Sequence, residues 1–595
     1  MTSRLRSWIS RPGVLAVGGS AIAGLAIALP ATGLAFTDRW DVPLVYDGDG
    51  LAVASHVKSI IETGWYEHQP RLGAPHGQDY HDYPTQDDAN FLALRMIAAI
   101  VPVWGVVMNV HFLIGFALAA ATMAWFLLRV GIRPIPTCAL ALVYALAPYH
   151  FYRGEAHMFL SWYWVVPLGL VIVWRILRSE PLWGARAGIP RGLGHLLGRT
   201  GGTAVSLVLL ATVSVYYGVF IAVLAVCAAI GVLVIVRDRQ RFLGSVLAGA
   251  ILVVVLVLVA LPDWVHGWTN GQNAAALVRS PPGAEIYALK LTALLLPAPA
   301  HRFGPFAELR ALYDQYYPVS SEAPALGLIG AAGLVALVVV LALTLVRAVL
   351  GRTAPAGAWR VLGSLGFLVF IALLFSWLGG VATIISFVSS SIRAWNRMSI
   401  VIAALALAAI GVLIDLLVKR VVSGGRPRWI GPVTASVAGV VLVGIAYWDQ
   451  VPAYDADART ATIAEFDSDA AFAQAIESSS LPGAMVFQLP YLAFPESPPV
   501  GRASDSDQLR MFLHTDTLRF SGGGIKGRAQ IDRFAQLAES PAPELVSGIE
   551  ELGFVGVIVD RFADVDGTLE SGLVEELDAP ALQSADRRFA YWSIP

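Results

Sequence analysis

The sequence predicts a polytopic α-helical membrane protein that ends in an extracytoplasmic α/β domain. Its 595 residues are 56% hydrophobic and only 14% charged, and the mean hydropathy is +0.65. Soluble proteins carry about 25% charged residues, and a helix of about 20 apolar residues crosses a bilayer. Many apolar runs approach that length before residue 447, and none follows it. The net charge of −2 provides no basic field for nucleic acid, so we expect no nucleic-acid partner.

About eleven apolar segments have the length and composition expected of membrane spans. They cover residues 14–36, 105–129, 134–149, 158–176, 202–214, 218–236, 243–262, 324–346, 361–379, 398–418 and 430–447. The stretch 202–236 is the hardest to divide, because it is too long for one helix and short for two. Its SVYYG sequence indicates a tight turn or a break.

Basic residues predict the orientation, because Lys and Arg collect in cytoplasmic loops. Alternate connections carry them, at Arg129 and Arg133, then at Arg175 to Arg199, Arg237 to Arg241, Arg347 to Arg360, and Lys419 to Arg428. This alternation predicts a cytoplasmic N-terminus and an extracytoplasmic C-terminus in the plasma membrane.

The same orientation assigns four connections of the transmembrane module, residues 1–447, to the outer side. They are 37–104, 150–157, 263–322 and 380–397, and the domain 448–595 follows them. In this domain VFQLPY, FVGVIVDRF and RFAYWSI are typical of strands, whereas AAFAQAIESS and AQIDRFAQLAE are typical of helices. We therefore expect a small α/β domain.

The first outer loop is strongly acidic, with ten acids against three bases between residues 37 and 90. Asp47 and Asp49 precede LAVASHVKSIIETGW, whose apolar spacing predicts an amphipathic helix on the membrane surface that ends at Gly64. An Asp at a helix start can be an N-cap worth ~1 kcal/mol. It can also accept a hydroxyl proton as a general base, and two carboxylates can hold a divalent cation. Both interpretations stay open for these two residues.

Three stretches of the first third resemble one known family. They are YDGDGLAVASHVKSIIETGWYEHQPRLGAPHGQDYHDYP, DDANFLALRMI and ALAPYHFYRGEAHMFLSWYWVVPL. They resemble the GT-C superfamily of integral-membrane glycosyltransferases, especially bacterial members that use a polyprenyl-phosphate sugar. The resemblance implies a GT-C-like fold and a catalytic acid in the first outer loop. That acid matches Asp49 best, and Asp47 is the close competitor.

The resemblance also implies a second acidic cluster, for the acceptor or a metal, which Asp82, Asp87 and Asp88 fit. The adjacent Asp-Glu or Glu-Asp pair of some members is absent. Dependence on Mg²⁺ or Mn²⁺, with Asp47 and Asp49 as candidate ligands, therefore stays open.

A departing lipid phosphate needs positive charge, and the Arg guanidinium can bind phosphate through two hydrogen bonds. Candidates on the outer side are Arg393, Arg397, Arg153, His150, His157, Lys290, His301 and Arg302. Arg393 and Arg397 could instead anchor a helix at the interface, and the histidines could be structural. His56 and Glu322 are candidates for orienting a sugar, although Glu322 could simply cap the next span.

The favoured hypothesis is an inverting hexosyl- or pentosyltransferase. It would move a sugar from a polyprenyl-phosphate donor to a hydroxyl of a cell-envelope glycan or lipid on the outer face. A transporter or flippase of lipid-linked sugars would place charges within the spans and show related halves, and the spans carry almost no charge. A membrane acyltransferase would need an active-site histidine, for which His150 and His157 are available.

Overall fold

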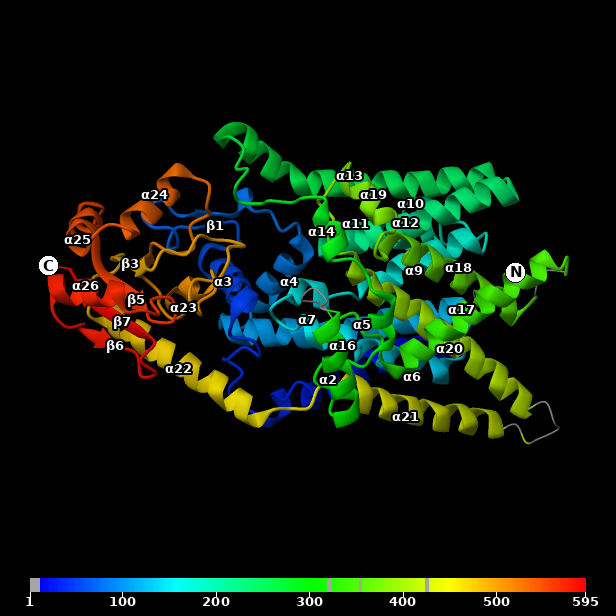
Figure 1. The fold of residues 1–595 in the computed structure, drawn as a ribbon. Coiled ribbons are helices and arrows are strands. Elements are labelled where there is room, and N and C mark those ends of the chain that lie inside the picture. Colours follow the sequence, from blue (N-terminus) through cyan, green and yellow to red (C-terminus); the bar gives the residue numbers. More distant parts are fainter. Residues whose placement is uncertain (1–10, 318–322, 353–355, 423–426, 428, 595) are drawn as a thin grey trace.

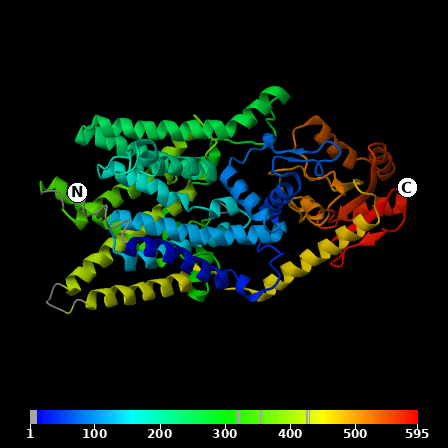
Figure 2. The same ribbon diagram turned by 180° about the vertical axis from the view of Figure 1, so that it is seen from behind.

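The computed structural model describes residues 11–317, 323–352, 356–422, 427 and 429–594. Apolar helices form one part of the molecule, and the α/β region forms the other (Figures 1 and 2). Within the described residues, nine helical stretches are long and apolar enough to cross a membrane. They are α2 (Arg11–Ala31), α5 (Trp104–Val130), α6 with α7 (Pro134–Ala145 and Pro148–Arg153), α12 with η3 (Val215–Gly231 and Val232–Val236), α13 (Arg239–Asn270), α17 (Gly327–Val349), α18 (Ala358–Ser376), η4 with α20 (Trp395–Met398 and Ser399–Val422) and α21 (Ile430–Gln450).

Two further predicted spans are shorter apolar helices, α9 (Val165–Leu177) and α11 (Arg199–Val213). Every predicted segment therefore contains an apolar helix, and the multi-pass helical class is confirmed. The stretch 202–236 divides at Ser214, whose extended backbone (φ −165°, ψ 124°) separates α11 from α12.

One boundary prediction is wrong. We expected a loop from residue 263, but α13 continues to Asn270 and has 32 residues. At 1.5 Å per residue it is about 48 Å long, against about 30 Å of hydrocarbon. The helix continues because polar residues that leave the bilayer can still complete backbone hydrogen bonds along it.

Short elements fill the connections between the long helices. Those of the segment 37–104, which keeps here the name of its predicted position, the first outer loop, are α3 (Gly48–Thr63), β1 (His68–Gln69), β2 (Gln78–Asp79), η2 (Tyr80–Asp82) and α4 (Asp88–Ala98). The others before residue 450 are η1 (Leu34–Phe36), α8 (Met158–Ser161), α10 (Arg191–Leu196), α14 (Pro282–Ile286), α15 (Leu291–Leu295), α16 (Gly304–Tyr316) and α19 (Val381–Ser386).

Helix α3 ends at Gly64, as predicted, where a φ of 87° favours glycine. Residues 50–60 are almost entirely buried, so protein and not solvent covers this helix, and its expected position on the membrane surface stays a prediction. The α/β region covers them, and Lys58 Nζ donates to the carbonyls of Leu513 (3.1 Å) and Thr515 (2.7 Å). The first outer loop is therefore enclosed between the apolar helices and the C-terminal region (Figure 1).

The C-terminal region contains a five-stranded sheet of order β4-β3-β5-β7-β6, in which β7 runs antiparallel to β5 and β6. The predicted strands and helices are confirmed. The strands are β3 (Met485–Leu489), β4 (Arg519–Phe520), β5 (Phe554–Asp560), β6 (Leu582–Gln583) and β7 (Phe589–Ser593). The helices are α22 (Ala456–Ser478), α23 (Arg510–Leu513), α24 (Ala529–Ala538), α25 (Ala542–Glu551) and α26 (Thr568–Leu577), with η5 (Asp507–Leu509) before α23.

Candidate active site

The chain just before Asp47 is held by a buried carboxylate. Glu155 Oε2 accepts hydrogen bonds from the backbone N–H groups of Leu44 (2.6 Å) and Val45 (3.2 Å). Glu155 is fully buried, and burial raises its pKa to about 7. A Cβ at Gly50 would lie 3.0 Å from the Val45 carbonyl oxygen, so glycine allows this close approach. Sequence reasoning missed Glu155, although it lies within the conspicuous RGEAH stretch.

Asp47 and Asp49 differ in position at the start of α3. Asp47 occupies the N-cap position, but its side chain makes no capping hydrogen bond within the described chain. Asp49 lies in the first turn, its side chain is 66% exposed, and its Oδ2 is 3.5 Å from His157 Nε2. The surrounding protein removes part of the water around Asp49, and this desolvation raises its pKa most. The negative charges of Asp505 and Glu496 raise the pKa further, whereas the positive charge of Arg397 lowers it.

The positive charge of Arg397 acts both on Asp49 and on the second acidic cluster. Its guanidinium carbon lies 4.3 Å from the centroid of the Tyr216 ring, and its charge acts on both Asp49 and Asp87. Arg153 similarly lies over Tyr149, at 4.9 Å. The structure therefore places His157 beside Asp49, and the charge of Arg397 reaches both Asp49 and Asp87.

The tyrosines near these cations come from the break in the stretch 202–236. Because Ser214 is extended, α12 begins with Tyr216 and Tyr217 next to Arg397 and the 149–160 segment. The Tyr217 hydroxyl donates to Tyr149 Oη (3.0 Å). SVYYG was the available signal for these residues, but periodicity alone assigned no role to them.

The three predicted aspartates of the second cluster separate into two environments. Asp87 and Asp88 begin α4, where burial and their mutual repulsion raise the pKa of Asp87 well above its usual range. Burial, followed by Glu67 and Asp263, raises the pKa of Asp88 to about 6. Asp82 is instead bound by Arg528 of the α/β region, through Nη2–Oδ1 (2.6 Å) and Nε–Oδ2 (2.7 Å).

Arg393 and Arg397 are four residues apart, but they face different partners. Arg393 Nη2 forms an ion pair with Glu496 Oε1 (2.9 Å), and Arg279 binds the other oxygen of the same carboxylate (2.6 Å). Glu496 reaches them from the loop after β3, with a φ of 52°. Sequence reasoning identified Arg393 but missed Arg279 and Glu496.

His56 has different surroundings from this group. His56 is buried among Tyr66, Tyr80 and Phe91, and burial lowers its pKa to about 3. Its expected role in orienting a sugar stays a prediction. Glu322 lies outside the described residues.

Four predicted cations of the phosphate site also lie in other surroundings. His150 is fully buried and stacks on Phe116, with centroids 3.5 Å apart. His301 is buried with its Nε2 3.4 Å from Asp449, and Arg302 donates to the Val451 carbonyl (2.6 Å). Lys290 is half-buried at the start of α15.

The potential metal ligands converge away from the start of α3. Within the described ranges, the group whose ligand atoms lie within 4.8 Å of one another is Glu67, His81 and Asp263. Asp47 and Asp49 belong to no such group of three in that part of the chain.

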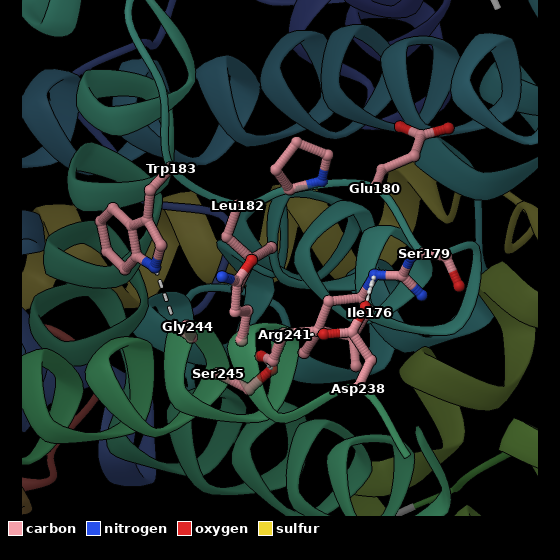
Figure 3. A pocket seen from close by; sticks show the side chains of 11 residues that line it. Ile176, Ser179, Glu180, Leu182, Trp183, Asp238, Arg241, Gly244 and Ser245 are labelled. Carbon is pink, nitrogen blue, oxygen red and sulfur yellow. Dashed lines mark hydrogen bonds and ion pairs between the residues drawn. The ribbon is translucent and has the colours of Figure 1, made fainter. Parts of the chain in front are cut away.

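A separate cavity of about 380 Å³ lies between the 176–183 segment and the start of α13 (Figure 3). Trp183 Nε1 donates across it to the Gly244 carbonyl (2.9 Å), and Arg241 pairs with Asp238 (3.0 Å). It lies among connections predicted to be cytoplasmic, and its lining includes none of the predicted site residues.

Structural comparison identifies similar membrane proteins. A structure of ArnT from Cupriavidus metallidurans bound to undecaprenyl phosphate matches 97% of this chain and 98% of that chain, with a TM-score of 0.51 and 12% identity. Two oligosaccharyltransferase structures from Archaeoglobus fulgidus match 96% of this chain and 74% or 73% of theirs. One is AglB in complex with an inhibitory peptide and a dolichol-phosphate (TM-score 0.41, 12% identity), and the other is a complex with Zn and sulfate (TM-score 0.40, 11% identity).

No protein-family model and no curated protein sequence matches this chain. The similarity of this chain to known proteins therefore rests on the comparison of structures. The match to ArnT extends over nearly the full length of both chains, and it confirms the predicted multi-pass helical fold with a C-terminal α/β region.

Proposed function

We propose that this protein is a membrane glycosyltransferase. It transfers a hexose or pentose from a polyprenyl-phosphate donor to a hydroxyl of a cell-envelope glycan or lipid. The observation that carries the proposal is the exposed Asp49 carboxylate, which lies 3.5 Å from the His157 imidazole and is acted on by the charge of Arg397. The fold shared with ArnT, whose structure contains undecaprenyl phosphate, supports a lipid-phosphate donor.

Asp49 is the proposed general base. Its raised pKa makes it a better proton acceptor than an ordinary carboxylate. It accepts the proton of the acceptor hydroxyl, and the hydroxyl oxygen forms a bond to the anomeric carbon. The bond from that carbon to the phosphate oxygen breaks, and polyprenyl phosphate leaves with the electron pair. Attack opposite the leaving group inverts the anomeric centre.

His157 and the arginines support this step in different ways. His157, 3.5 Å from Asp49, is a positioning residue for the carboxylate. Arg397 and Arg153 offer guanidinium groups for the departing phosphate, and Arg binds phosphate well because its donors form a planar fork. Arg397 also acts on Asp87, where its charge opposes the rise in the pKa of that carboxyl group.

The site is proposed to face the extracytoplasmic side of the plasma membrane. The first outer loop, Glu155 and the α/β region meet at one end of the apolar helices (Figure 1). The connections rich in Arg lie between the opposite helix ends, where the orientation rule predicts cytoplasm.

The decisive experiment is turnover by the purified full-length protein in nanodiscs. A panel of polyprenyl-phosphate sugars is supplied with extracts of envelope glycans and lipids, and release of free polyprenyl phosphate is measured with and without EDTA. We expect release by wild type and by Asp47→Asn, and none by Asp49→Asn. Equal release by wild type and Asp49→Asn would remove the base assignment, and the EDTA arm shows whether Mg²⁺ or Mn²⁺ contributes.

A further inference from the structure

A cluster of nitrogen and oxygen donors lies where the first outer loop meets the end of α13. Its members, here called the loop–helix cluster, are Glu67, His81 and Asp263. His81 Nδ1 is 2.8 Å from Asp263 Oδ1, and His81 Nε2 is 3.7 Å from Glu67 Oε2. The proposed transfer reaction uses none of these three side chains.

A second histidine borders this cluster. His266 lies three residues after Asp263, and residues at this spacing share one face of a helix. The His266 and His81 rings are 5.2 Å apart, and His266 Nδ1 is 3.7 Å from Asp79 Oδ2. Two imidazoles and three carboxylates therefore converge from the outer loop and α13.

An arginine of this region, Arg528, already has a carboxylate partner. Arg528 binds both oxygens of Asp82, which itself lies 3.5 Å from His266 Nε2. Glu67 and Asp263 thus face the His81 imidazole, and Asp79 faces the His266 imidazole. A bound divalent cation would compensate this negative charge.

We propose that Glu67, His81 and Asp263 bind a divalent transition-metal ion, Zn²⁺ or Mn²⁺. Imidazole nitrogen with carboxylate oxygen suits these ions, whereas Mg²⁺ and Ca²⁺ prefer oxygen ligands alone. His266 or Asp79 is near enough to complete the shell after a side-chain rotation. The ion replaces the proton shared by His81 and Asp263, and it fastens η2 of the outer loop to α13.

The test is metal binding by full-length protein in detergent, stripped with a chelator and then dialysed against Zn²⁺, Mn²⁺ or Mg²⁺ separately. Bound metal is counted by mass spectrometry, and the thermal midpoint is recorded at each metal concentration. We expect one Zn²⁺ or Mn²⁺ per wild-type chain and a metal-dependent rise in the midpoint. His81→Ala and Asp263→Asn should weaken binding at least about 10-fold, as even indirect ligand supports do.

Two variants serve as controls. His76→Ala removes an exposed histidine of the same loop, and Asp49→Asn removes the proposed base, so both should bind metal like wild type. If His81→Ala does not fold, Glu67→Gln is judged by the same criterion. Absence of Zn²⁺ and Mn²⁺ from folded wild type, or equal binding by wild type and the cluster variants, would overturn the proposal. Because the readout is bound metal, it can fail while glycosyl transfer succeeds, and the reverse also holds.

Discussion

Two aspartates in different parts of the first outer loop show how one residue type serves two purposes. Asp49, at the start of α3, is 66% exposed and faces His157. Asp82, in η2, is 6% exposed and both of its oxygens are bound by Arg528 of the α/β region. Asp82 has its charge compensated in place, so it fastens the loop, whereas Asp49 keeps an accessible oxygen for a substrate proton. A loop fixed at its far end can present a reactive carboxylate at its beginning.

The largest expected effect separates these two aspartates. Asp49→Asn removes the proposed base and should lower turnover about 10²–10⁴-fold, the usual contribution of general-base catalysis. Its thermal midpoint should stay unchanged because the side chain is exposed. Asp82→Asn should do the reverse, with turnover largely retained and a lower midpoint, because Arg528 loses a charged partner. Equal losses of turnover in both variants would contradict the division of roles.

The second effect concerns the segment just before Asp47, here called the strap, whose Tyr46 carbonyl accepts a hydrogen bond from Arg510 of the α/β region. Arg510 is 2% exposed, pairs with Asp469 (2.9 Å) and Asp507 (2.6 Å), and donates to the Tyr46 carbonyl (3.1 Å). Arg510→Met leaves buried carboxylates with less compensation, so we expect about 3–5 kcal/mol of destabilisation. Chemical unfolding of the purified protein measures it.

Arg561→Met is the matched control for Arg510. Arg561 pairs with Glu570 in the same region, but both are partly exposed, so its loss should cost about 1 kcal/mol or less. A control variant as unstable as Arg510→Met would show that the strap contact is not the cause.

The third effect is a pH dependence of stability at Glu155. Its pKa is about 7 in the folded chain and ordinarily 4.5, so the unfolded chain releases this proton first. Burial of Glu155 therefore lowers the free energy of unfolding increasingly as the pH rises from about 4.5 to 7, and by about 3 kcal/mol at most. Glu155→Gln keeps an acceptor for the Leu44 N–H group and has no charge to bury. We expect the thermal midpoint of Glu155→Gln to rise relative to that of wild type between pH 5 and 7.5. A difference in midpoint that stays constant over this range would refute the raised pKa of Glu155.

Hydrophobic runs and turn residues in the sequence were enough to predict the span regions, the Gly64 end of α3 and the strands of the α/β region. These features are local, because each depends on the composition of a single window. The start of α3 was likewise found from its two aspartates and the family resemblance. The local pattern misled at residues 263–270, where the helix continues, and it did not show that a distant segment covers α3.

Partners from distant segments could not be predicted in this way. Glu496 binds Arg393 across 103 residues, and Glu155 holds Leu44 across 111. Periodicity in a single sequence carries no information about such pairs. The aromatic surroundings of His56 are a further example, because the local pattern did not show that its helix face points toward Tyr80 and Phe91.

The smallest effect tests whether the charges around Asp49 act on the reactive group itself. The deprotonated carboxylate is the active form, so turnover rises as pH increases through its pKa. Asp505 raises that pKa and Arg397 lowers it. Asp505→Asn should therefore move the acidic limb of the pH–kcat profile to lower pH, and Arg397→Ala should move it to higher pH. Each shift should be less than about one pH unit, because solvent screens charges around an exposed group.

Arg397→Lys keeps the positive charge but loses the planar fork, so it should reduce turnover while it leaves the limb near its wild-type position. This variant separates the effect of Arg397 on Asp49 from its proposed contact with phosphate. Shifts of Asp505→Asn and Arg397→Ala in the same direction would mean that another group controls the limb. Opposite shifts would identify Asp49 as the titrating base, because the two substitutions change its pKa with opposite signs.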